Sequence, residues 1–175
     1  MTSMKRLSLL LFLALIPVST FFVLNGIGGM PDRIAIHFDV SGSADAWTDR
    51  GLYRLFILLS LVGLPLLLVW LMAGLPRRTN GKGQVPNSEY WFAQERRQST
   101  EAFLLAHACW LGCLTVAVVY GIHVFILRAN SNDPPELDSG RFITMLIVYL
   151  CGLLWWMVTF IRHFQRVEKD NRSQQ

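Results

Sequence analysis

Four uninterrupted blocks of apolar residues dominate the chain. They cover residues 7–27, 55–75, 102–127 and 142–161, and none contains Asp, Glu, Lys or Arg. Each block is close to the roughly 20 helical residues that cross a hydrocarbon core of about 30 Å. One such charge at the centre of a spanning helix costs about 2.5 to 3.5 kcal/mol, so its absence supports the length argument independently. The pattern predicts an all-α membrane protein, a single domain over residues 1–175 with four transmembrane helices.

The loop between the first two blocks, residues 28–54, has a different pattern. From Ile34 to Val40 apolar and polar residues alternate, and a period of two is typical of an extended strand with one apolar face. Gly42 then marks a turn, after which Trp47 can fold back onto the apolar face or the membrane interface. We therefore expect a short strand and turn in this loop. The apolar face would consist of Ile34, Ile36, Phe38 and Val40.

The polar face of the same strand carries residues capable of acid–base or metal chemistry. His37 and Asp39 are two positions apart and so share a face, and Asp45 returns close to them after the turn. A carboxylate beside an imidazole stabilises the imidazolium form, which suits pH sensing or proton transfer. The simpler interpretation is a polar face toward water whose side chains hydrogen-bond the turn. A calcium loop is excluded, since Ala44 stands where that loop requires Gly.

The loop between the second and third blocks, residues 76–101, predicts a helix along the inner membrane surface. Its first part, Pro76 to Pro86, is rich in helix-breaking residues and is expected to be irregular. Asn87 is placed to cap the amphipathic helix that follows. Anchoring at the lipid surface is the simpler role for this helix, and recognition of a cytoplasmic partner is the alternative. Its candidate interface residues are Tyr90, Trp91, Glu95, Arg96 and Arg97.

The composition agrees with a membrane protein. Hydrophobic residues make up 53% of the chain and charged residues only 16%, against about 25% charged in soluble domains. The formal net charge of +4 does not indicate nucleic-acid binding, because the basic residues are divided among separate segments rather than clustered on one module. Their expected effect is attraction to anionic lipid.

The distribution of basic residues predicts the orientation, because Lys and Arg are retained on the cytoplasmic side. The N-terminal segment, the loop at 76–101 and the tail at 162–175 together hold eleven of the sixteen Lys and Arg residues. We therefore expect both termini and the 76–101 loop in the cytoplasm. The 28–54 loop would be extracytoplasmic.

The outer loop also contains a motif, formed by Pro31, Ile34, His37, Phe38, Gly42, Asp45 and Trp47. In type and spacing it resembles the signature of a bacterial membrane domain of unknown function that also begins the SdpI-like immunity and signalling proteins. That signature is a Pro-x-x-Ile-Pro-x-His-Phe run followed by Gly, Asp and Trp. The resemblance covers residues 25–60, and Ala35 departs from it where the family usually has proline. Residues 87–97 look like a second stretch shared by short relatives, and the extra helices of long SdpI-like members are missing.

This resemblance implies a small multi-pass protein of the bacterial inner membrane, in a family with members tied to toxin immunity and signal transduction. It implies no catalytic residue, cofactor or metal. We therefore expect a non-enzymatic binding, signalling or immunity-type protein whose outer loop takes an extracytoplasmic peptide or protein ligand. The candidate binding residues are His37, Phe38, Asp39, Asp45 and Trp47, and the motif residues with a structural role are Pro31, Ile34 and Gly42.

Two other classes remain open from the sequence. A small transporter or channel usually exposes ionisable residues within its spans, and only His107 and His123 qualify. At 100° per residue they fall on nearly opposite faces of one helix, which argues against a single relay. A membrane enzyme would use His37 and Asp39 as an acid–base pair, yet the chain has no nucleophile elbow, phosphate loop or HExxH motif. The oligomeric state stays open.

Overall fold

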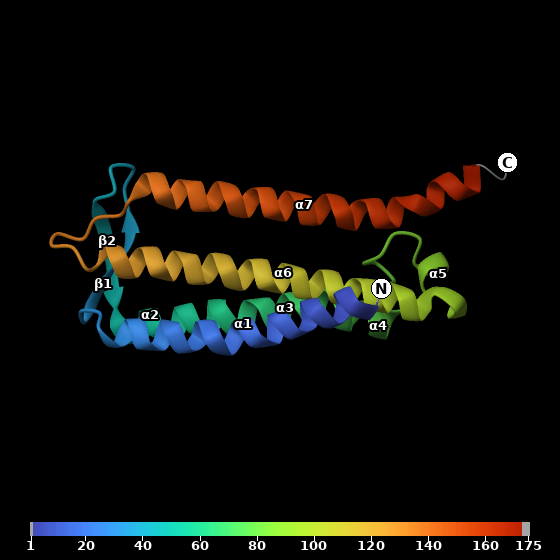
Figure 1. Ribbon diagram of the computed structural model, residues 1–175, viewed down its shortest axis with the longest axis horizontal. Helices are drawn as coiled ribbons and strands as arrows, with labels where there is room; N and C mark the ends of the chain where they lie inside the picture. The colour runs from blue at the N-terminus through green and yellow to red at the C-terminus, as the bar shows by residue number, and fades with distance from the viewer. Residues whose placement is uncertain (1, 173–175) are drawn as a thin grey trace.

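Four long helices and one β-hairpin make up the protein, in a computed structural model that describes residues 2–172 (Figure 1). The hairpin lies at the end of the molecule where the first helix passes into the second. This arrangement confirms the predicted fold class. In chain order the elements, with η marking a π-helical turn, are α1 (Thr2–Gly28), β1 (Arg33–Phe38), β2 (Ala44–Asp49), α2 (Arg50–Leu58), η1 (Leu59–Gly63), α3 (Leu64–Val69), η2 (Trp70–Gly74), α4 (Leu75–Thr79), α5 (Ser88–Trp91), α6 (Gln94–Ala129) and α7 (Ser139–Arg172).

All four long helices are long and apolar enough to cross a membrane. They also extend past the apolar blocks: α6 has 36 residues, a rise of about 54 Å against a hydrocarbon core of about 30 Å. The tail predicted at 162–175 is helical as far as Arg172, and residues 173–175 lie outside the described residues. The candidate spans are Arg6–Gly28, Arg50–Thr79, Gln94–Ala129 and Ser139–Gln165.

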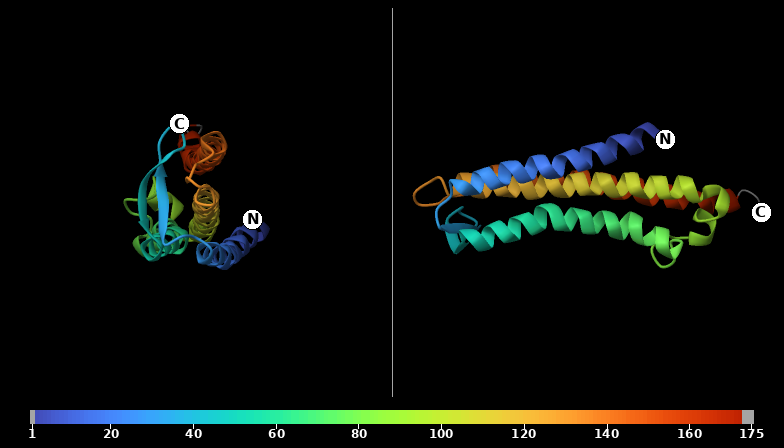
Figure 2. Two further views of the ribbon diagram at one scale, coloured as in Figure 1. Left: turned by 90° about the vertical axis from the view of Figure 1, so that its left-hand side faces the viewer. Right: turned by 90° about the horizontal axis from the view of Figure 1, so that it is seen from below.

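The second span runs from α2 to α4 and is interrupted by two wide turns, each ending two residues before a proline. In η1 the N–H of Leu64 donates to the carbonyl of Leu59, five residues back, and Pro65 follows. In η2 Leu75 donates to Trp70 in the same way, and Pro76 follows. Proline has no N–H, and its ring collides with the carbonyl four residues earlier, so a wider turn at this point relieves the collision. The span curves gently as a result (Figure 2, right).

The helix α6 lies at the centre of the bundle. The helix α1, the second span and α7 all pack against it. Seen from the end, α7 lies on the opposite side of α6 from α1 and α2 (Figure 2, left). The helix α7 therefore has its main contacts with α6, and its apolar span is not buried inside the protein.

The main apolar core lies at the hairpin end and joins the hairpin to three helices. Ile34 of β1 is fully buried in it, with residues from the end of α1, the start of the second span and the second half of α6. The hairpin is therefore part of the folded core rather than a loose extension. The buried members of this core are Val23, Ile27, Met30, Ile34, Tyr53, Ile57, Leu61, Val116 and Val119.

The loop between the second and third spans differs from the single surface helix that the sequence predicts after Asn87. Asn87 precedes a helix, but its φ is 51° and its side chain makes no capping hydrogen bond. The helix α5 lasts only one turn, and a break at Phe92 separates it from α6, whose first turns include the charged residues. Phe92 is buried against Leu104 of α6 and Phe164 of α7. Burial of its aromatic residues against the bundle explains why this segment does not form one helix along the surface.

Candidate functional site

The hairpin at residues 33–49 is a two-stranded antiparallel sheet with two irregularities, one at Ile36 in β1 and one at Asp45 in β2. Its register pairs Ala35 with Trp47 and then His37 with Ala46, so Ile36 forms a bulge in β1. The strict alternation predicted for this strand is therefore wrong beyond Ile34. Ile34 and Ala35 are both fully buried, whereas Ile36 is 42% exposed. The bulge carries Ile36 away from the face on which Ile34 meets the core.

His37 and Asp45 form the polar pair of the hairpin. The His37 Nδ1 and Asp45 Oδ1 atoms are 2.5 Å apart, across the two strands, and both side chains are exposed. Asp45 thus returns to His37 as the sequence indicates, but Asp39 does not share this contact. The candidate acid–base pair of His37 and Asp39 is not formed.

Asp39 instead organises the turn at the tip of the hairpin. Its Oδ1 atom accepts hydrogen bonds from the Ser41 hydroxyl at 2.6 Å and from the backbone N–H groups of Ser41 and Ser43 at 2.8 and 3.0 Å. The hydrogen bonds from Ser41 and Ser43 hold the pKa of the Asp39 carboxyl below its ordinary value of 3.8. Asp39 is therefore a structural residue of the turn.

The remaining candidate residues of the loop at 28–54 divide into exposed and structural ones. Trp47 is 44% exposed on β2, and Phe38 is half-buried opposite Ala44. Gly42 has a φ of 92°, and a Cβ at this position would collide with the carbonyl oxygen of Leu137. Glycine is therefore required at this turn. Pro31 is exposed, just before β1.

Two arrangements fix the base of the hairpin to the helices. The Asp49 carboxylate caps α2 by accepting from the N–H groups of Gly51 and Leu52 at 2.7 and 3.2 Å. Arg50 donates to the Met30 carbonyl at 2.8 Å and to the Asp32 carboxylate at 2.7 Å. The chain entering β1 and the chain leaving β2 are thus held together at the start of the second span.

A second set of contacts ties the hairpin to the loop between α6 and α7. Asn130 Oδ1 accepts from the Ala35 N–H at 2.8 Å, and Asn130 Nδ2 donates to the Ala35 carbonyl at 2.9 Å. Near the tip, the N–H of Leu137 donates to the Gly42 carbonyl at 2.8 Å. Sequence reasoning missed Asn130, because nothing local distinguishes an asparagine at a helix end that caps from one that binds a distant strand.

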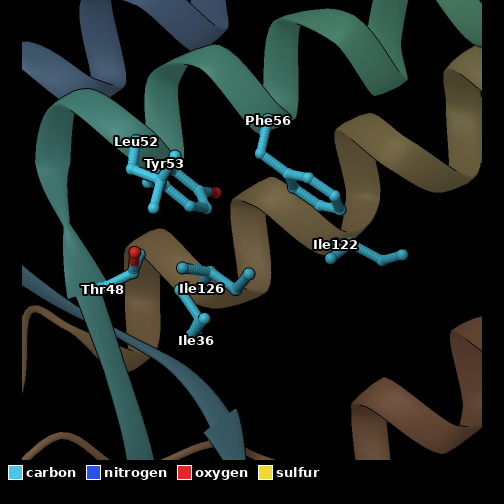
Figure 3. A pocket seen from close by; sticks show the side chains of 7 residues that line it. All are labelled: Ile36, Thr48, Leu52, Tyr53, Phe56, Ile122 and Ile126. Carbon is cyan, nitrogen blue, oxygen red and sulfur yellow. The ribbon is translucent and has the colours of Figure 1, made fainter.

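An apolar pocket lies between the hairpin, α2 and α6 (Figure 3). It has a volume of about 400 Å³. The bulge residue Ile36 forms part of its wall, so the hairpin and the helices shape it together. A lining of this kind suits hydrocarbon rather than a polar ligand. The lining residues are Ile36, Thr48, Leu52, Tyr53, Phe56, Ile122 and Ile126.

Behind this pocket lies a buried polar pair that joins the second span to α6. The Tyr53 hydroxyl and His123 Nδ1 are 2.8 Å apart, and both residues are at least 97% buried. The Nε2 atom of His123 has no hydrogen-bond partner and lies against Gly26 of α1. His107 faces α7, with its ring near Trp156 and its Nε2 atom 3.5 Å from the Thr159 hydroxyl. The two histidines are therefore separate, in agreement with their predicted opposite faces.

The candidate interface residues of the loop at 76–101 mainly hold that loop together. Arg96 donates to the Tyr90 carbonyl at 2.9 Å and lies 3.9 Å above the Tyr90 ring. Arg97 pairs with Glu101 at 3.0 Å, and the ring of Trp91 stacks on His163 of α7. Glu95 is exposed. These contacts connect α5 to α6 and α7.

No candidate metal centre is present in the part of the chain that the structure describes. Among residues 2–172, no three His, Cys, Asp or Glu side chains are close enough to hold one ion. The exposed His37 and Asp45 side chains can bind a ligand through hydrogen bonds and charge, and the exposed Trp47 ring can bind one through aromatic contact.

The four apolar helices define the class: this is a multi-pass membrane protein. Within it, residues 9–69 match the family described as Domain of unknown function (DUF1648). The matched stretch runs from α1 through the hairpin to the end of α3, and so contains the whole candidate binding loop. No curated protein and no solved structure matches the chain.

Proposed function

We propose that the protein is a non-enzymatic receptor of the bacterial inner membrane. Its hairpin binds an extracytoplasmic peptide or protein and passes the effect to the helices, and both termini lie in the cytoplasm. The resemblance of the outer-loop motif to SdpI-like proteins supports a role in immunity or signalling for this binding. The match of residues 9–69 to a domain of unknown function is compatible with that role and assigns no chemistry.

One observation carries the proposal: the hairpin is attached to the bundle at two separate places. At its base, Arg50 and Asp49 hold it to the start of the second span. On its side and near its tip, Asn130 and Leu137 hold it to the loop between α6 and α7. A ligand that moves the hairpin must therefore alter at least one of these attachments.

The helix that a movement of the hairpin would displace most readily is α7. It follows the attached loop directly and packs mainly against α6. Its cytoplasmic end contacts α5 through Trp91 and His163. A shift that begins at the hairpin would reach the cytoplasmic loop along this helix, and it requires no catalytic group.

The test is capture of the ligand in living cells. A photoactivatable amino acid at Val40, which is fully exposed at the tip, should crosslink to an extracytoplasmic partner, and the same amino acid at Lys82 should not. His37→Ala combined with Trp47→Ala should abolish capture from Val40 while the protein still inserts in the membrane. Capture that survives both substitutions would show that the hairpin is not the binding site.

A further inference from the structure

The apolar pocket joins the membrane-spanning part of the protein to the hairpin. Phe56 and Ile122 lie inside two of the apolar blocks of the sequence, within about 8 Å of the hairpin-side end of each block. Ile36 and Thr48 belong to the hairpin and lie outside the spans. Because these residues line one cavity of about 400 Å³, the pocket extends from the depth of the lipid hydrocarbon to the level of the hairpin.

The pocket opens beside two large apolar side chains of the second span. Leu52 and Phe56, which form part of its wall, are 60% and 68% exposed. At this depth in a membrane the neighbouring medium is hydrocarbon. A water molecule would need about two to four polar partners to stay in such a space, and the lining is almost entirely apolar. The bilayer itself therefore supplies an occupant that fits the pocket, the acyl chain of a lipid.

Among the described residues, one free polar side chain lines the pocket, at its hairpin end. Two lining side chains carry a polar atom, and Tyr53 uses its hydroxyl to bind His123. The Thr48 hydroxyl has no hydrogen-bond partner in the part of the chain that the structure describes. Figure 3 shows Thr48 at one end of the pocket and Phe56 and Ile122 at the other. A free hydroxyl followed by hydrocarbon matches the beginning of a phospholipid chain, in which an ester carbonyl accepts hydrogen bonds and the methylene groups after it do not.

We propose that this pocket binds one ester-linked acyl chain of a phospholipid from the leaflet on the hairpin side. The Thr48 hydroxyl donates to the ester carbonyl, and the first carbons of the chain run between Leu52 and Ile126 toward Phe56. The chain fills the space between the bulge residue Ile36 and the two helices, so the hairpin packs on protein and lipid together. Lipid binding at this place is independent of the receptor function.

Native mass spectrometry of the full-length protein tests the pocket as the binding site. The probe is a phosphatidylcholine, supplied in nanodiscs from which the protein is released into detergent before the measurement. One phospholipid should stay bound per protein. Leu52→Trp places a larger ring in the pocket and should lower the retained fraction several-fold. Leu59→Trp, at an equally exposed position of the same span outside the pocket, should leave it unchanged. Equal retention by the two variants would overturn the proposal.

A pair of lipids tests the contact with Thr48. The native protein is offered an equal mixture of ester-linked phosphatidylcholine and its ether-linked counterpart, which has the same chains and headgroup but no ester carbonyl. The ester lipid should be retained in about two- to tenfold excess, as expected for one neutral hydrogen bond. Thr48→Val keeps the shape of the side chain, removes its hydroxyl and should abolish the preference. Equal retention of both lipids by the native protein would overturn the proposed binding mode.

Two further measurements use the native sequence alone and so do not depend on the folding of the variants. A phosphatidylcholine with a diazirine beside the ester carbonyl should label Ile36 on illumination, and absence of label on the hairpin would contradict the proposal. Palmitic acid in excess should not displace the bound phospholipid, because none of the described lining residues is a Lys or Arg that could pair with its carboxylate. Displacement would identify a free fatty acid as the ligand and overturn the assignment to a phospholipid.

Discussion

The side-chain amide of Asn130 binds the backbone of Ala35 twice: its oxygen accepts from the Ala35 N–H at 2.8 Å, and its nitrogen donates to the Ala35 carbonyl at 2.9 Å. Asn130 is the residue that ends α6, and it also donates to the carbonyl of Ile126 one turn earlier. A single side chain thus closes a helix and pairs with a strand 95 residues away in sequence.

This double contact makes Asn130→Asp a sharp test of the attachment. Aspartate has nearly the same shape and can still accept from the Ala35 N–H, but it cannot donate to the Ala35 carbonyl. We expect a loss of about 1 to 3 kcal/mol in the free energy of docking the hairpin, the usual cost of an unsatisfied buried acceptor. Faster hydrogen exchange at the Ala35 amide would report it. Asn132→Asp, in the exposed loop, is the control and should leave that rate unchanged.

The buried contact between Tyr53 and His123 should contribute to stability in the same way. Tyr53→Phe leaves both ring nitrogens of His123 without a partner and should cost about 1 to 3 kcal/mol of unfolding free energy. Adding His123→Phe removes the imidazole that the first substitution leaves buried without a hydrogen bond. The double variant should therefore recover part of the lost unfolding free energy. The check is thermal unfolding in detergent micelles. A double variant that is less stable than Tyr53→Phe would contradict this account of the pair.

Close packing of α1 on α6 depends on Gly112. A Cβ there would collide with the ring of Phe12, which is only 2% exposed and has little room to move. Gly112→Ala should therefore lower the unfolding temperature, as expected where small residues let membrane helices approach. Gly121→Ala is the matched control on the same helix, because its new methyl meets only the flexible side chain of Met145. Equal losses from the two variants would contradict this explanation.

The turn at the tip of the hairpin should be sensitive to acid. The folded-state pKa of Asp39 lies below 3.8, so the charged carboxylate stabilises the turn above that pH and the contribution disappears as the pH falls through the lowered value. An NMR titration should place the midpoint of Asp39 below 3.8, with the Ser43 amide signal following it. Asp39→Asn should remove this dependence, whereas Asp45→Asn should leave it. A midpoint at or above 3.8 would show that the Ser41 and Ser43 hydrogen bonds do not persist in solution.

The orientation can be read from single cysteines in a variant that lacks the three native ones. A membrane-impermeant maleimide should label Val40→Cys on intact cells and Lys82→Cys only after permeabilisation. Both native side chains are exposed, so their accessibility does not limit the labelling. The reverse pattern would place the hairpin in the cytoplasm and would refute the receptor proposal.

The spans and the hairpin could be predicted from the sequence because both depend on local properties. Hydropathy over about 20 residues identifies a spanning helix, and the turn at Gly42 follows from glycine's access to positive φ. The bulge at Ile36 could not be predicted in this way. It arises where one strand must place Ile34 in the helix core and Ile36 against the pocket, and that demand comes from helices distant in sequence.

In the candidate site, too, the sequence predicts local features and misses contacts between distant residues. The return of Asp45 to His37 follows from the length of the turn, so the sequence indicates it. Whether Asp39 faces His37 or the turn depends on which hydrogen bonds compete, and three donors from Ser41 and Ser43 outnumber one imidazole. The contacts of Asn130 and of Tyr53 with His123 join residues 70 or more positions apart, beyond any periodicity.

The π-helical turn at η1 has a geometric consequence. Its helix places buried residues every fourth position, at Tyr53, Ile57, Leu61 and Pro65. In a regular α-helix each such step overshoots a full turn by about 40°, so three steps would carry the stripe about 120° around the axis. The wide turn removes part of this rotation and so sets the angle around the helix axis between Tyr53 and the half of the span that follows η1. Deleting one residue from η1 would leave the hydropathy of the segment intact and rotate one half against the other by about 100°. The number of residues in this span, as much as their apolar character, decides whether Tyr53 meets His123.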